Sequence, residues 1–71
     1  MEKQYEPRPL TELGDLIDRA VLLVCEHGAF EGGLKGISKD DIHIEVDDGQ
    51  VMAVERSVLE SDLTELYLVV E

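Results

Sequence analysis

The sequence predicts an α+β domain in which one N-terminal helix packs on a three-stranded antiparallel sheet, in the order α-β-β-β. Apolar residues recur with a helical period over residues 11–27, two alternating runs flank a turn within residues 41–54, and residues 65–71 are rich in β-forming side chains. The chain of 71 residues has room for one core. We therefore expect an extended arm over residues 1–10 and a single α+β domain over residues 11–71.

The arm and the helix are separated by a change in residue type. Pro7 and Pro9 hold the arm extended, and Thr11 is a good helix N-cap. At about 100° per residue, the apolar side chains that follow fall in one arc of a helix. These are Leu13, Leu16, Ile17, Ala20, Val21, Leu23 and Val24. Gly28 is placed to end the helix, with His27 as a partly buried capping residue in its last turn.

Residues 28–40 contain four glycines and are expected to cross flexibly from the helix to the sheet. Phe30, Leu34 and Ile37 are expected to reach the edge of the core. A phosphate-binding loop needs Gly-Lys followed by Ser or Thr at the start of a helix, whereas Ile37 follows Lys35–Gly36 here. The segment therefore predicts a connection and no phosphate site.

The hairpin expected over residues 41–54 has a register that its turn decides. Its first strand alternates apolar and polar residues, with Ile42, Ile44 and Val46 on one face. A two-residue loop would place Glu55 opposite Ile42, on the apolar face. A three-residue loop with Gly49 in the left-handed conformation of a G1 bulge pairs Ile42 with Val54 and Ile44 with Met52. The sequence favours the second register.

The third strand is expected over residues 65–71, ELYLVVE. Leu66, Leu68 and Val70 would share one face, and Tyr67 and Val69 the other. Residues 55–64 alternate irregularly, and Ser57 can cap a single turn there. This connection permits a meander or a crossing that returns the last strand to the side of the first; we expect the meander.

Charge is concentrated in the second half of the chain. The net charge is −11, and residues 40–71 carry ten acids with Arg56 as their one basic residue. Such a field disfavours direct binding to nucleic acid or to an anionic membrane, and predicts a protein partner with a basic surface. The acids expected to bind it are Asp40, Asp41, Glu45, Asp47, Asp48, Glu55, Glu60, Asp62 and Glu65.

The residue types give no sign of catalytic or metal chemistry. No pattern spaces a nucleophile against a base, so we expect no enzyme and no catalytic residue. On a helix Cys25 and His27 would point about 160° apart, which prevents them from sharing an ion. We expect no metal and no cofactor. One cysteine allows no internal disulfide, and the longest apolar run has six residues, so we expect a cytoplasmic protein.

Two functions fit these features. The first is a small acidic protein-binding module, an inhibitor or adaptor that occupies a basic groove of its partner, such as one that binds nucleic acid. The second is a structural or regulatory subunit of a homo-oligomer, such as a homodimer, or of a hetero-oligomer, which docks through an apolar sheet face. The residues expected at that interface are Val51, Ala53, Tyr67 and Val69. Binding through the acids should weaken steeply with salt, and binding through the apolar face should not.

Overall fold

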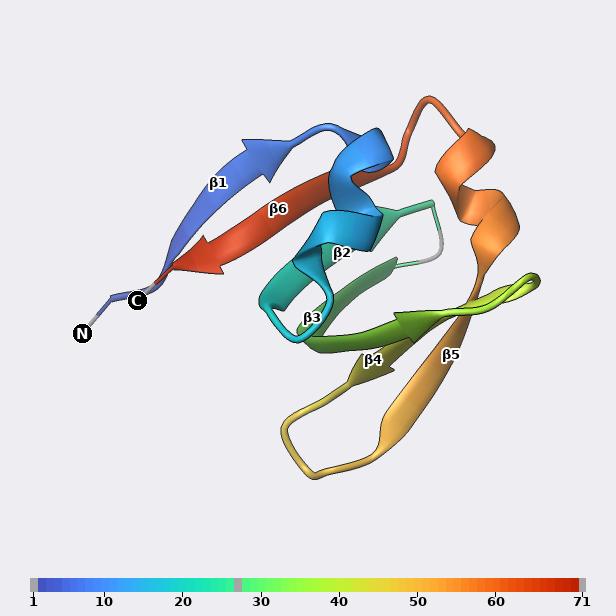
Figure 1. The fold of residues 1–71 in the computed structure, drawn as a ribbon. Helices are drawn as coiled ribbons and strands as arrows, with labels where there is room; N and C mark the ends of the chain where they lie inside the picture. Colours follow the sequence, from blue (N-terminus) through green and yellow to red (C-terminus); the bar gives the residue numbers. More distant parts are fainter. Residues whose placement is uncertain (1, 27, 71) are drawn as a thin grey trace.

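The computed structural model describes residues 2–26 and 28–70, and most of its regular structure is β. Six strands form one antiparallel sheet in the order β1-β6-β2-β3-β4-β5 (Figure 1). The strands are β1 (Gln4–Arg8), β2 (Ala20–Cys25), β3 (Gly28–Ile37), β4 (Asp41–Glu45), β5 (Val51–Glu55) and β6 (Glu65–Val70), and two short 3₁₀ helices are η1 (Leu10–Leu16) and η2 (Arg56–Glu60). The prediction of one N-terminal helix on a three-stranded sheet is therefore wrong.

The predicted helix is divided between η1 and β2. After η1 the chain turns at Asp18, whose φ of 72° is left-handed, a conformation that aspartate tolerates better than most residues. From Ala20 the burial alternates, with Val21 and Leu23 fully buried, as in a strand with one face on the core. A short apolar run is compatible with either a helix or a buried strand. Residues 20–25 form a strand because they pair with β3 on one side and with β6 on the other. The capping role predicted for His27 falls outside the described residues.

The glycine-rich connection expected over residues 28–40 is instead mostly the longest strand, β3. Its first half pairs with β2, and its second half pairs with β4 after an irregularity between Leu34 and Gly36. At Gly32 a β-carbon would collide with the backbone carbonyl of Glu45, so the chains approach there more closely than any other residue allows. Glycine is therefore required at this point of the sheet, which curves around one core (Figure 1).

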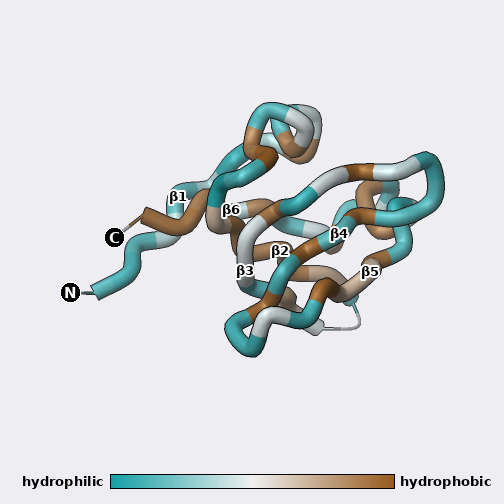
Figure 2. The backbone as a smooth tube through the Cα atoms, turned by 60° about the horizontal axis from the view of Figure 1, so that its bottom comes forward, coloured by the Kyte–Doolittle hydropathy of each residue, from teal (hydrophilic) through white to brown (hydrophobic). Residues whose placement is uncertain are grey.

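The core lies on the inner face of the bent sheet. Every strand from β2 to β6 contributes to it, and η1 covers it with Leu13 and Leu16. Backbone hydrogen bonds between β3 and the turn after η1 hold this cover: Asp18 N donates to Leu34 O at 2.7 Å, and Leu34 N donates to Arg19 O at 2.9 Å. Hydrophobic and hydrophilic residues alternate along much of the sheet (Figure 2). As predicted, three residues of β3 reach the core: Leu34 is fully buried, and Phe30 and Ile37 are partly buried against it.

The register predicted for the hairpin is confirmed. Ile42 lies opposite Val54, and Ile44 lies opposite Met52. Val46 N donates to Gln50 O at 2.8 Å across a three-residue loop, and Gly49, with a φ of 86°, closes the turn by donating to Val46 O at 2.9 Å. The loop thus has the left-handed glycine that a G1 bulge requires.

The last strand is confirmed, but the meander is wrong. β6 has Leu66 and Leu68 buried on one face, and it lies between β1 and β2 instead of beside β5. Its partner β1 is formed by residues of the predicted arm, with Pro7 on this edge strand, where a missing N–H costs little. The single turn expected after the hairpin is η2, which begins one residue before Ser57 and has no side-chain cap bond from any residue that the structure describes.

Candidate protein-binding surface

The outer face of the β4–β5 hairpin carries acids at both ends. Three cross-strand pairs form it: Asp41 opposite Glu55, His43 opposite Ala53, and Glu45 opposite Val51. We call these six residues the hairpin face. Ile42 and Ile44 alternate with these residues along β4 and point inward, where they are buried. Burial of this apolar face fixes which residues point outward.

Four carboxylates gather at one end of the hairpin face. Asp40, Asp41, Glu55 and Glu60 line one open hollow, together with Lys39 and Arg56. Within residues 2–26 and 28–70, none of these four carboxylates is in an ion pair. Arg56 points its guanidinium at the carbonyl of Ser38 at 3.4 Å, and Glu55 accepts a weak hydrogen bond from Ser57 at 3.5 Å. Like charges placed directly opposite each other on neighbouring strands destabilise a sheet.

The other end of the hairpin face is also acidic but is partly neutralised. Glu45 lies 3.9 Å from the ammonium group of Lys35. Asp47 and Asp48 occupy the turn, where the Asp48 carboxylate accepts the backbone N–H of Gln50 at 3.1 Å. From Asp41 to Glu45 the strand spans about 13 Å. The hairpin therefore presents two acidic ends separated by His43 and Ala53.

Two of the predicted acids lie on the other side of η2. Asp62 is in the connection to β6, and Glu65 begins that strand opposite Val24. The carboxylate of Glu65 accepts the hydroxyl of Tyr67 at 2.8 Å, and this hydrogen bond raises the pKa of the tyrosine. The predicted acids are thus divided between a cluster on the hairpin with Glu60 beside it and two further residues, Asp62 and Glu65, towards β6.

The structure does not bring the predicted apolar interface together. Val51 and Ala53 are exposed on β5, whereas Tyr67 and Val69 are half-buried on β6, and three strands lie between them in the sheet. Val69 lies opposite Tyr5 of β1, so residues of the predicted arm form the neighbouring strand on that side of β6.

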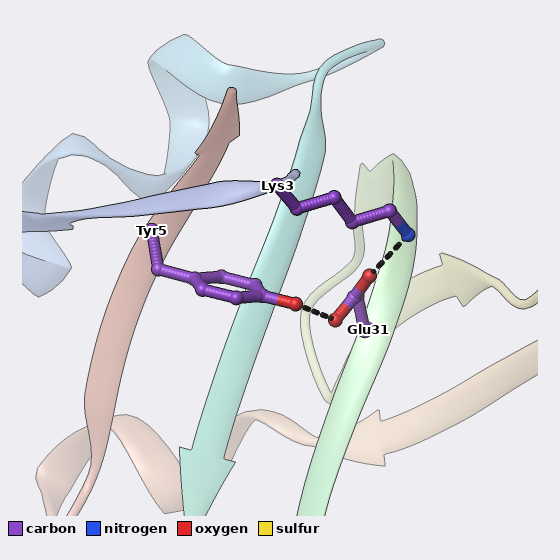
Figure 3. A network of polar contacts seen from close by, with 3 residues as sticks. All are labelled: Lys3, Tyr5 and Glu31. Atoms are coloured by element: carbon purple, nitrogen blue, oxygen red, sulfur yellow. Dashed lines mark hydrogen bonds and ion pairs between the residues drawn. The ribbon is translucent and has the colours of Figure 1, made fainter. Parts of the chain in front are cut away.

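A polar network that the sequence did not suggest ties β1 to β3. The ammonium group of Lys3 and the hydroxyl of Tyr5 each lie 2.8 Å from a carboxylate oxygen of Glu31, and the tyrosine ring points from β1 toward β3 (Figure 3). The hydrogen bond from Lys3, followed by that from Tyr5, lowers the pKa of Glu31. The hydrogen bond to Glu31 raises the pKa of both donors. No local pattern in the sequence signals a contact between residues this far apart.

Other kinds of site are not seen in the described residues. No three His, Cys, Asp or Glu side chains there approach closely enough to hold a metal ion. The thiol of Cys25 is buried and donates to the carbonyl of Gly28 at 3.3 Å. No helix of the described chain has the length and apolar character needed to cross a membrane. No protein-family model, curated protein or solved structure matches the chain.

Proposed function

We propose that the protein is a small protein-binding module whose acidic hairpin face docks on a basic surface of a partner protein. The observation that carries this proposal is the placement of Asp41 directly opposite Glu55, with Asp40 and Glu60 on the same hollow. Such a like-charge pair costs a few tenths of a kcal/mol to about 1 kcal/mol. Residues that lower the stability of the fold without a compensating contact nearby are typical of a functional site. A cationic partner would supply the compensating contact here.

The partner surface that fits best is a concave basic one. Acids at both ends of a strand pair, about 13 Å apart, can be neutralised together only by a surface that extends along the hairpin. A groove that binds nucleic acid has this extended basic character. The protein then acts as an inhibitor or adaptor that takes the place of phosphates. The alternative, an oligomer subunit that docks through one apolar face, has less support because Val51 and Ala53 lie apart from Tyr67 and Val69.

The test combines stability with binding. The double variant Asp41→Asn/Glu55→Gln should raise the free energy of unfolding by about 0.5 kcal/mol, because it removes the facing charges. It should also weaken binding to a ten-residue lysine peptide, measured by NMR shifts of the hairpin residues, and wild-type binding should weaken steeply with salt.

The matched control changes the net charge equally at another place. Glu12→Gln/Asp15→Asn removes two charges from η1, so it should leave peptide binding near the wild-type value. Equal weakening by both double variants would show that only the overall charge matters, and would refute docking at the hairpin face.

A further inference from the structure

The outer edge of β5 has backbone groups that pair with no other strand of the described residues. Within residues 2–26 and 28–70, β5 is the last strand in the sheet order and pairs only with β4. The bonds Val46 N to Gln50 O and Arg56 N to Asp40 O show which facing pairs are hydrogen-bonded. By the alternation of an antiparallel ladder, the N–H and C=O groups of Val51, Ala53 and Glu55 point away from β4.

The apolar β5 edge differs from the β1 edge, which carries residues that discourage strand pairing. The edge strand β1 has Pro7 and charged residues on either side of it, Glu6 and Arg8. Proline and charge discourage pairing with another strand. The first three residues of β5 are Val-Met-Ala, with Val51 53% exposed and Met52 41% exposed. An exposed apolar edge strand is a template for strand addition.

We propose that β5 binds an extended basic segment of the partner, which adds a seventh strand to the sheet. The inference rests on the function proposed above and specifies its binding mode. An added strand places alternate side chains beside Glu55, Ala53 and Val51 on the outer face. A lysine or arginine fits the first place, beside the Asp41–Glu55 pair, and a small or β-branched residue fits beside Ala53. A second basic residue beside Val51 reaches toward Glu45, so the recognised pattern is basic-x-apolar-x-basic.

Charge argues against a second copy of this chain as the occupant. With a net charge of −11, two copies repel each other. A two-fold pairing centred on Ala53 would also bring the Glu55 residues and hairpin acids of both copies to one seam. A basic segment meets the same edge with attraction, which selects it over self-association.

The experiment uses the full chain and the peptide Thr-Lys-Thr-Val-Thr-Lys-Thr, in three forms. One form is unmodified, and the other two are N-methylated on alternate residues, in the odd or the even set. In an added strand only one set of N–H groups faces β5, so one methylated form should bind about tenfold more weakly and the other should bind within about twofold of the unmodified peptide. Hydrogen exchange should show new protection at Val51, Ala53 and Glu55.

The other outcomes separate this proposal from the function on which it rests. Salt-sensitive binding that both methylated forms retain equally, without protection of the β5 amides, would overturn strand addition and leave docking at the hairpin face intact. Absence of binding to this peptide and to the lysine peptide at low salt would overturn both. At low salt, where the negative charges of two copies repel each other most, protection of the same amides that grows with protein concentration and needs no peptide would identify a second copy as the occupant and overturn the proposal.

Discussion

Gly32 is the position where one added carbon should damage the fold most. A β-carbon there would lie 2.8 Å from the carbonyl carbon of Glu45 and nearer still to its oxygen, with the Ile44 Cγ2 atom at 3.1 Å. Two of these three neighbours are backbone atoms, so no rotamer change relieves the overlap, and β3 must move away from β4. Overpacking a core costs about 1–3 kcal/mol, and a collision with backbone belongs at the upper end of that range. We expect Gly32→Ala to lose about 3 kcal/mol.

That loss is large for this chain. At about 0.1 kcal/mol per residue, the 71 residues give a total near 7 kcal/mol, of which the substitution removes almost half. With a urea dependence of about 1 kcal/mol per molar, the unfolding midpoint should fall by about 3 M. Circular dichroism during urea titration measures it.

The neighbouring glycine provides the control. A β-carbon on Gly33 would meet only the end of the Lys35 side chain, at 4.0 Å. Because glycine in a strand costs about 0.5–1 kcal/mol relative to alanine, Gly33→Ala should be neutral or slightly stabilising. Equal midpoints for the two variants would refute the account of the close approach between β3 and β4 at Gly32.

The remaining predictions concern the turn and the polar network. Gly49→Ala should lower the free energy of unfolding by about 1 kcal/mol in a urea titration, because the φ of 86° strains an alanine. By NMR titration, the pKa of Glu31 should lie below the ordinary glutamate value, and Lys3→Met should raise it more than Tyr5→Phe does. Because the folded-state pKa of Glu31 is lowered, its contribution to stability is present above the ordinary glutamate pKa and is lost as the pH falls through the folded value. An unchanged pKa in Lys3→Met would contradict the network.

Local signals predicted the parts of the fold that depend on local chemistry. The hairpin register follows from the alternation of apolar and polar residues in β4 and from one glycine that can take a positive φ. These two signals lie within ten residues of each other. The opposition of Asp41 and Glu55 is contained in that register. Most of the candidate site was therefore accessible from the sequence.

Elements whose conformation depends on contacts between distant parts of the chain could not be predicted from the sequence. The run from Ala20 to Cys25 satisfies a helical arc, and it becomes a strand because β3 and β6 pair with it from elsewhere in the chain. Glycines in β3 predict a loop by composition, although Gly32 is needed because a β-carbon there would collide with the backbone of Glu45 in β4. The exposed edge of β5 was missed for a related reason, since the expected meander placed the last strand against it.

The negative charge of the chain has opposite effects on the two partners that could bind the β5 edge, a second copy and a basic segment. Changing the salt concentration therefore distinguishes between them. It repels a second copy of the chain and attracts a basic segment. The screening length falls from about 10 Å at 0.1 M to about 3 Å at 1 M ionic strength, so added salt weakens both effects. We therefore expect high salt to weaken binding of the basic peptide and to promote association between copies through Val51 and Ala53, measured by sedimentation equilibrium. Ala53→Lys places a charge on the edge and should suppress the self-association at every salt concentration. A chain that stays monomeric at 1 M salt would show that something other than charge protects this edge.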